Sequence, residues 1–182
     1  MSVSRADDCL GETLRALSES GQADDTVVVF LSDHGMPFPL AKTCLYHHST
    51  RTPWMVRWPG QVKAGSHDSD HMISALDLLP TLLDIAEIDH PNGLEGRSFY
   101  EVLKGNKQPE LDHVIKEYNE SSGRRRHPMR AVQTKRFNYI FNPWAAGGRK
   151  DPLWAAHAPL CGQTATPRAN LVFVFYCFVG FR

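Results

Sequence analysis

Apolar side chains near the start of the chain recur at the spacing of a helix. They follow one another at intervals of three or four residues, at Val3, Ala6, Leu10, Leu14 and Leu17. This spacing is typical of a helix with one buried face, because an α-helix turns once about every 3.6 residues. Gly21 comes after the last of them, and glycine commonly ends helices. The pattern predicts a helix that ends before Gly21.

Two further apolar segments have the character of strands. Residues 26–31 form an unbroken, β-branched run, which favours a strand buried on both faces, as in a parallel sheet covered by helices. In residues 53–59, Trp54, Val56 and Trp58 alternate with the positions between them, as in a strand with one buried face. A helix followed by a buried strand is half of an α/β unit. We therefore expect an α/β fold with a mostly parallel sheet and flanking helices.

The second half of the chain is expected to hold short helices and then strands. Asp77 is the expected N-cap of a helix over residues 77–85, and Ser98 that of a shorter helix over residues 98–103. Strands are expected over residues 113–118, 130–134 and 137–141, the last two forming a hairpin. Strands gathered behind an α/β unit predict a small antiparallel subdomain.

The last part of the chain has no clear pattern. Residues 155–170 show little periodicity, and residues 171–182 are a hydrophobic end. This end is either a core strand or aberrant sequence. We favour the second, because so apolar a run promotes aggregation when it is exposed. We expect residues 155–182 to be poorly ordered.

Charge and composition exclude several classes of protein. The 182 residues carry 20 basic and 20 acidic side chains and are 42% hydrophobic, which is typical of one globular domain. A general nucleic-acid binder needs a basic excess and is disfavoured. The balance conceals a split, since residues 1–100 hold 14 acids and 7 bases, whereas residues 101–182 hold 6 acids and 13 bases. The second half can therefore carry a local anion site.

Other features bear on compartment and membrane association. The four cysteines are scattered, without the spacing of a metal site or a disulfide framework. The first residues have neither the basic nor the apolar region of a signal peptide. The longest apolar run, residues 171–181, has 11 residues. A membrane-spanning helix needs about 20, so we expect no membrane span.

Ligand-capable side chains follow the first predicted strand. Asp33 and His34 come directly after it, where ligands bind in open α/β sheets. A carboxylate oxygen and an imidazole nitrogen can share one divalent cation, and the imidazole favours transition metals over calcium. Lys42 could bring an ammonium to an anion on that metal, and His47 and His48 could act as acids, bases or ligands. The alternative for an Asp-His pair is an ordinary cap or surface loop.

The same segment resembles a known family. Residues 26–35, with the sequence Thr-Val-Val-Val-Phe-Leu-Ser-Asp-His-Gly, resemble the second metal-binding segment of the sulfatase family, within the alkaline-phosphatase superfamily. Residues 33–43, which contain Pro-Phe-Pro, are similar to its N-sulfoglucosamine sulfohydrolase branch. Further segments resemble the family in the right order at residues 45–60, 74–83 and 127–134. The resemblance covers residues 2–145, and several ordered motifs together are specific.

The resemblance implies a fold and a reaction. Residues 1–110 would be the C-terminal part of a sulfatase catalytic α/β domain, residues 111–154 part of an antiparallel subdomain, and residues 155–182 a divergent tail. The implied reaction is hydrolysis of sulfate esters or N-sulfate groups on a sulfated small molecule or glycan. The implied cofactor is a divalent metal, calcium in the first place. Manganese and zinc are alternatives because of the histidine at position 34.

The resemblance also implies roles for individual residues. Asp33 and His34 would be metal ligands, and Lys42 would contact the sulfate group. His47, His48 and His127 would contact substrate, and the favoured alternative for each is an exposed loop histidine. The assembly state stays open.

One departure from the family concerns the nucleophile. Sulfatases use a cysteine or serine in a Cys/Ser-x-Pro-x-Arg motif, converted to formylglycine, and the 182 residues contain no such motif. The family's first pair of metal aspartates is missing as well. We therefore interpret the chain as a C-terminal fragment without a catalytic nucleophile and expect it to be inactive alone. The family implies a lysosomal, periplasmic or extracellular location for a full-length homologue.

Two alternative functions stay open. A phosphate or phosphonate monoester hydrolase of the same superfamily is favoured by His34. A non-catalytic fragment that binds a metal or an anionic glycan is the other. The basic residues 124–126, with Arg130, Lys135 and Arg136, are either a solvated surface or an attraction for a sulfated sugar chain.

Overall fold

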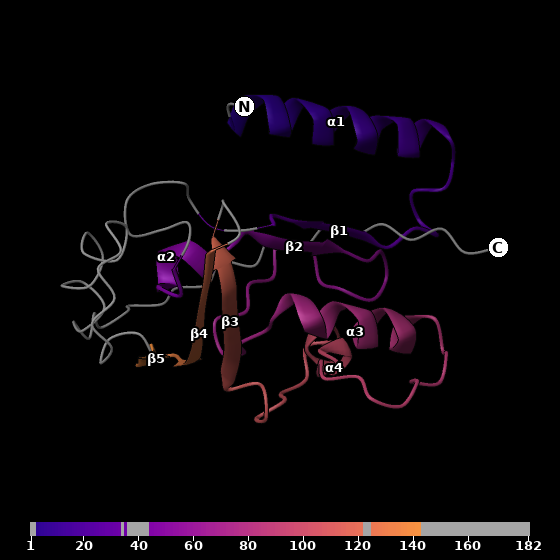
Figure 1. The fold of residues 1–182 in the computed structure, drawn as a ribbon. Helices are drawn as coiled ribbons and strands as arrows, with labels where there is room; N and C mark the ends of the chain where they lie inside the picture. Colours follow the sequence, from indigo (N-terminus) through magenta and orange to yellow (C-terminus); the bar gives the residue numbers. More distant parts are fainter. Residues whose placement is uncertain (1–2, 34, 36–43, 122–124, 143–182) are drawn as a thin grey trace. The chain divides into compact units, whose positions relative to one another are not determined.

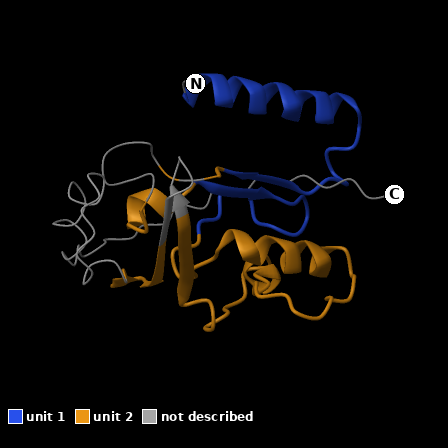
Figure 2. Cartoon of the chain, viewed as in Figure 1, with its two compact units in different colours: residues 1–31, 53–67, 172–182 blue, residues 32–52, 68–171 orange. Residues whose placement is uncertain are grey.

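The computed structural model describes residues 3–33, 35, 44–121 and 125–142, and of residues 120, 121 and 125–127 the backbone alone. These residues belong to two compact units (Figure 2). The first unit holds residues 3–31 and 53–67, and the second holds the remaining described residues. His34, Lys42 and residues 155–182 lie outside the described residues, so the predictions for them stay predictions. The predicted boundaries at residues 110 and 154 also stay predictions.

The first unit contains one helix and a two-stranded sheet (Figure 1). Helix α1 spans Val3–Glu19, and Gly21 follows it with a φ of 73°, which confirms the predicted helix and its end. Strands β1 (Val28–Leu31) and β2 (Trp54–Arg57) confirm the two predicted strands. The expected burial of β1 on both faces is not found, because Val28 is buried and the other three residues are half-buried. Every second residue of β2 is buried, as its alternation predicts. Within the described residues, no helix is long and apolar enough to cross a bilayer.

The pairing of these two strands differs from the expectation of a parallel sheet. β1 and β2 run antiparallel, with Val28 opposite Arg57 and Leu31 opposite Trp54. Parallel pairing is therefore not found among the strands that the structure describes. The physical reason is that an apolar run reports how deeply a strand is buried and says nothing of the direction of its neighbour.

The second unit combines short helices with a three-stranded sheet (Figure 1). Its elements are α2 (His47–Thr50), the one-turn 3-10 helix η1 (Ala75–Asp77), α3 (Leu78–Ile85), α4 (Tyr100–Leu103), β3 (His113–Ser121), β4 (Arg125–Thr134) and β5 (Asn138–Phe141). The strands are antiparallel in the order β3-β4-β5, which confirms the predicted antiparallel sheet and its second hairpin. Strands β3 and β4 are longer than expected, and the ladder between them is irregular between Tyr118 and Glu120.

The helical part of this unit is joined by the buried carboxylate of Asp77. Asp77 is the N-cap residue of α3, as predicted, but its side chain makes no capping hydrogen bond to that helix and instead forms a capping box with Ser74, three residues earlier. The two carboxylate oxygens accept hydrogen bonds from the backbone N–H groups of Ser74 and Arg97, each at 2.7 Å. Thr81 Oγ1 donates to the Asp77 carbonyl oxygen at 2.6 Å and accepts from the Phe99 N–H at 3.0 Å. Asp77 therefore links α3 to the segment that leads into α4.

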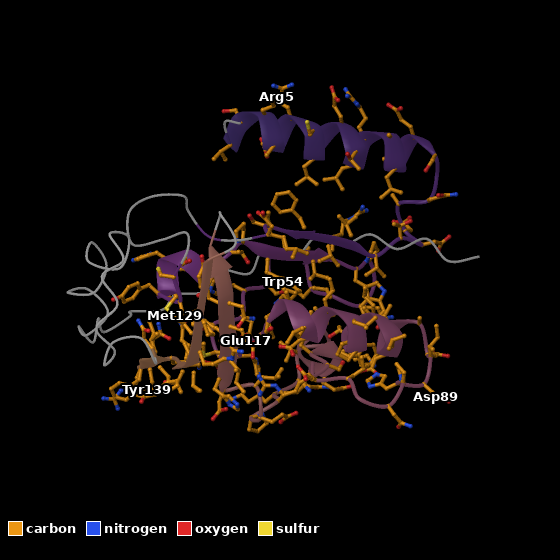
Figure 3. The ribbon with its side chains drawn as sticks, viewed as in Figure 1. Arg5, Trp54, Asp89, Glu117, Met129 and Tyr139 are labelled. Carbon is orange, nitrogen blue, oxygen red and sulfur yellow. The ribbon has the colours of Figure 1, made fainter. Side chains whose placement is uncertain are left out.

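Alternate residues of the three-stranded sheet share one face, called the covered face. By strand register its members are Val114, Lys116, Tyr118, Met129, Ala131, Gln133, Asn138 and Ile140. Leu45, from the segment before α2, packs against Met129 on this face. The opposite face carries Ile115, Val132 and Tyr139, which keep 63%, 43% and 69% of their surface exposed. Figure 3 labels Met129 and Tyr139, one from each face.

Candidate functional site

The candidate site begins where β1 ends. Asp33 comes two residues after Leu31, the last residue of the strand, and its side chain is exposed. The Ser32 hydroxyl donates to Asp33 Oδ1 at 3.4 Å. The structure therefore confirms that Asp33 follows a strand directly. Whether it is a metal ligand stays a prediction.

Gly35 fixes this turn against α2. The Gly35 N–H donates to the Ser49 carbonyl oxygen at 2.8 Å. A Cβ atom at position 35 would overlap the carbonyl oxygen of His48 and would lie 2.7 Å from that of Ser49. Only glycine allows so close a backbone approach. The contact brings the turn that carries Asp33 beside the backbone of His48, two candidates that are distant in the sequence.

The sequence motif Asp-His-Gly contains the signal for this contact, although we drew no inference from its glycine. A glycine that directly follows ligand-capable residues at a strand end often marks a close backbone approach. The partner in α2 could not have been foreseen, because four-residue helices have no periodicity to detect.

The two adjacent histidines of α2 differ in their surroundings. His48 is exposed, as the alternative to a substrate contact expects, but it lies in α2 and not in a loop. His47 lies in the same helix and is half-buried, so that alternative does not describe it. Their ring centroids lie 5.8 Å apart in an edge-on arrangement. Burial lowers the pKa of His47 below its usual value, and the nearby cations Arg51 and Lys116 lower it further. His47 is therefore neutral at neutral pH.

The remaining predicted site residues are only partly described. The backbone of His127 lies in β4, while its side chain is among those that are not described. His34 and Lys42 are outside the described residues. Among the residues that are described, no group of three or more histidine, cysteine, aspartate or glutamate side chains is gathered in a way that could hold a metal ion. Asp33 is thus the one predicted metal ligand whose position is known.

A cluster that the sequence did not suggest lies on the covered face of the three-stranded sheet. Lys116 donates to Gln133 Oε1 and, at 3.4 Å, to the carbonyl oxygen of Leu45. The Gln133 amide group in turn lies 2.8 Å from His47 Nδ1. Burial lowers the pKa of Lys116 to about 8 and raises the pKa of Tyr118. The available signal was that Lys116 lies at the spacing of two residues that places it on the same strand face as Val114 and Tyr118.

Comparison with known proteins places these features in a family. Residues 34–144, more than half of the chain, match the family model described as N-sulphoglucosamine sulphohydrolase, C-terminal. The chain is 34% identical over 149 residues to the human N-sulphoglucosamine sulphohydrolase, covering 77% of this chain and 29% of that protein. It is 31% identical over 114 residues to an N-acetylglucosamine-6-O-sulfatase of Bacteroides thetaiotaomicron, covering 60% of this chain and 20% of that protein.

A solved structure agrees with these relatives. It shows a protein bound to its substrate, D-glucosamine-2-N,6-O-disulfate, with a TM-score of 0.61 and 27% identity. The match covers 74% of this chain and 28% of the other chain. This chain therefore spans less than a third of the length of these relatives, and its fold corresponds to a part of the sulfatase fold. On these findings, which confirm the predicted resemblance, the chain belongs to the N-sulphoglucosamine sulphohydrolase C-terminal family of sulfatases.

Proposed function

We propose that the chain supplies the C-terminal part of a metal-dependent hydrolase that removes sulfate groups, as esters or as N-sulfate, from sulfated sugars. The observation that carries this proposal is the exposed Asp33 carboxylate, which follows β1 in a turn that Gly35 holds against α2. Two findings support the substrate class. A relative is named an N-acetylglucosamine-6-O-sulfatase, and a similar solved structure holds a glucosamine disulfate.

The proposed metal would be held in part by Asp33 and His34. An exposed carboxylate is a suitable oxygen ligand for calcium, and a neighbouring imidazole would favour manganese or zinc. When bound, such an ion draws negative charge from a sulfate oxygen. The described residues supply one carboxylate and no complete ligand set. Further ligands would have to come from outside the described residues, so we derive no reaction step through the metal.

We further propose that the 182 residues do not turn over substrate alone. They contain no Cys/Ser-x-Pro-x-Arg motif, and a covalent nucleophile cannot be removed without losing most of the rate. Lys42 in this proposal contacts the sulfate as a point charge. His48 and His127 are proposed substrate contacts, and the exposure of His48 is compatible with that role.

Metal titration tests the site directly. Calcium, manganese and zinc are titrated into the chain while binding is followed by calorimetry, for the wild type, Asp33→Asn and the exposed control Asp89→Asn. We expect Asp33→Asn to weaken binding of the preferred metal at least tenfold and Asp89→Asn to leave it unchanged. Equal binding by the wild type and Asp33→Asn would overturn the proposed ligand.

Release of sulfate tests the proposed inactivity. The chain is incubated with N-sulfoglucosamine and with an aryl sulfate at a saturating concentration of the preferred metal, and free sulfate is measured. We expect no release above the blank. Release that is lost in Asp33→Asn would contradict the inactivity and would show that the chain holds a complete site. Metal binding without any affinity for a sulfated sugar would instead favour a non-catalytic metal-binding role.

A phosphate or phosphonate monoester hydrolase is the second candidate, favoured by the histidine that follows Asp33 in the sequence. Competition separates the two functions. If bound N-sulfoglucosamine is displaced by a phosphonate monoester at lower concentration than by an aryl sulfate, the second candidate is preferred.

A further inference from the structure

The covered face holds buried hydrogen-bond donors that have no acceptor within the described part of the chain. Gln133, which is 3% exposed, lies between Lys116 and His47 and bonds to both. Its carbonyl oxygen accepts from the lysine, so its amide N–H₂ must donate to His47 Nδ1. A neutral His47 then carries its proton on Nε2. Among the described residues, this buried Nε2 has no hydrogen-bond partner.

Two further donors lie on the covered face of β3. The Tyr118 hydroxyl, two residues from Lys116 on the same face of β3, is buried and has no hydrogen-bond partner among the described residues. The Lys116 ammonium has three N–H groups, and its acceptors in the described part of the chain are the Gln133 side chain and the distant Leu45 carbonyl oxygen. We call Lys116, His47 and Tyr118, with Gln133 between the first two, the donor cluster.

The charged groups described around His47 are basic. The charges that act most strongly on His47 are those of Arg51, Lys116 and His48, all of them cationic or able to become so. Lys116 forms no ion pair with a carboxylate among the described residues, and the one anion that acts on it would be an ionised Cys44 thiol. A buried cation without a counter-charge is costly. Among the described residues, the donor cluster therefore lacks an acceptor with negative charge.

We propose that the donor cluster binds an oxyanion group, a sulfate or a carboxylate, of a sulfated sugar. Such a group accepts several hydrogen bonds and donates none, so it complements the Nζ of Lys116, the Nε2–H of His47 and the hydroxyl of Tyr118. A neutral ligand would leave the ammonium without a counter-charge. The sugar part of the proposal rests on the proposed function, whereas oxyanion binding itself rests on the donor cluster alone.

The position of the cluster links it to the rest of the site. Leu45, whose carbonyl oxygen accepts from Lys116 and from Asn138 Nδ2 at 3.0 Å, is three residues after Lys42 in the sequence. The cluster thus holds the chain segment that follows the proposed sulfate contact. A substrate with two anionic groups, such as the glucosamine disulfate of the similar structure, offers one group to each.

Calorimetry of the chain after its metal has been removed with a chelating resin tests the donor cluster without any metal and without a dissolved carboxylate that would compete for the site. Sodium sulfate, N-sulfoglucosamine and glucuronate are titrated at pH 7 into the wild type, Lys116→Met and the control Lys107→Met. Lys107 is an exposed lysine, so it matches the charge change without touching the cluster. We expect Lys116→Met to weaken binding of one or both sugars at least tenfold, and Lys107→Met to weaken it less than twofold. Equal losses in both variants, or none in Lys116→Met, would overturn the proposal.

A second variant guards against an effect of misfolding. Gln133→Glu places a carboxylate between Lys116 and His47, where it supplies the missing charge from within the chain. We expect it to raise the melting temperature and to abolish oxyanion binding. A variant that binds the anions as tightly as the wild type would contradict the assignment. Binding of free sulfate without binding of either sugar would overturn the sugar part.

Two more measurements separate this site from Asp33 and from general charge effects. Asp33→Asn should leave this metal-free binding unchanged, so failure of the metal proposal and failure of this one are distinguishable. The affinity should fall as the pH rises from 7 to 9.5, because Lys116 loses its proton. Cys44, His47, Arg51 and Tyr118 are the other charged or titratable groups around it. The Cys44→Ser variant lacks this thiol, and its affinity for the anion should still fall as the pH rises. If the affinity of that variant no longer depended on pH, the dependence would be due to Cys44 and not to Lys116.

Discussion

Two buried polar clusters of the second unit differ in how completely their hydrogen bonds are made. Around Asp77, both carboxylate oxygens and the Thr81 hydroxyl have partners, and the ties join α3 to the segment before α4. In the donor cluster, His47 and Tyr118 retain buried atoms without partners in the described residues. A fully bonded cluster stabilises the fold, whereas one with unmet donors costs stability unless a ligand completes it. The Asp77 cluster therefore stabilises the fold, whereas the donor cluster is incomplete within the described residues.

Breaking the complete cluster should have the largest effect. Asp77→Ala leaves the N–H groups of Ser74 and Arg97 without their acceptor, and each such loss costs about 1–3 kcal/mol. We expect the free energy of unfolding to fall by roughly 2–4 kcal/mol, measured by urea denaturation. The exposed Asp89→Ala is the control and should change it little. An equal effect of the two substitutions would show that Asp77 does not join the helical segments.

The buried side chain of His71, which is paired with Asp68, is a second place where a substitution should destabilise the helical part of the second unit. His71, 7% exposed, bonds Asp68 Oδ2 through Nδ1 at 2.8 Å and accepts the Gln108 N–H at Nε2 at 3.0 Å. His71→Phe should lower the free energy of unfolding by roughly 1–3 kcal/mol, because a buried N–H loses its acceptor. The matched control is His90→Phe, whose histidine makes a 2.8 Å contact with Asp84 at the surface. Exposed pairs contribute little, so a larger effect at His90 would contradict the comparison.

Removing the centre of the donor cluster should be far less costly. Lys116→Met removes a poorly compensated charge and one donor to Gln133, and we expect stability to stay within about 1 kcal/mol of the wild type at pH 7. A loss as large as that of Asp77→Ala would show that Lys116 is a structural residue with a complete set of partners.

The same lysine should also make stability depend on pH. The pKa of Lys116 is about 8 in the fold and 10.5 as its reference, so between these values the unfolded state binds more protons. Wild-type stability should therefore rise with pH above about 8, relative to Lys116→Met, and the difference should be flat below 8. Denaturation of both proteins at pH 7 and pH 9.5 measures it. A difference that does not change with pH would contradict the lowered pKa.

The smallest effect is expected at an exposed ion pair whose lysine lies in the turn between β4 and β5. Lys135 Nζ lies 3.0 Å from Asp70 Oδ1, and the pairing lowers the pKa of Asp70. Surface pairs of this kind are screened by water and salt. Lys135→Met should shift the melting temperature less than any variant above, and the shift should shrink further in 0.5 M salt, about the concentration at which screening becomes strong. A shift that grows with salt would exclude an electrostatic cause.

The sequence predicted the elements with strong periodicity and missed relations between distant segments. Helix α1 and strand β2 follow from the spacing of their apolar residues, and the β4–β5 hairpin from two short strands around a basic turn. The direction of the β1–β2 pairing could not be derived, because side-chain burial carries no information on it.

The candidate site was predicted in the same uneven way. Asp33 follows a strand as expected from its place after an apolar run. The donor cluster depends on Lys116, Gln133 and His47, which are 86 residues apart at the extremes and meet only when the sheet packs against α2. A local sequence pattern cannot predict a contact between residues so far apart in the chain. A lysine in a strand is usually solvent-exposed, so its residue type argued against a buried position for Lys116.

Gly35 has a consequence for the tolerance of the chain to mutation. Every amino acid other than glycine adds a Cβ atom, and at this position that atom would overlap backbone atoms of His48 and Ser49, which no change of rotamer can relieve. In a saturation library selected for folded protein, position 35 should therefore retain glycine alone, while Gly11, where a Cβ atom would meet nothing within 4 Å, should accept alanine. Because of this one backbone contact, the absence of a Cβ atom at position 35 would be the strictest sequence requirement in the candidate site.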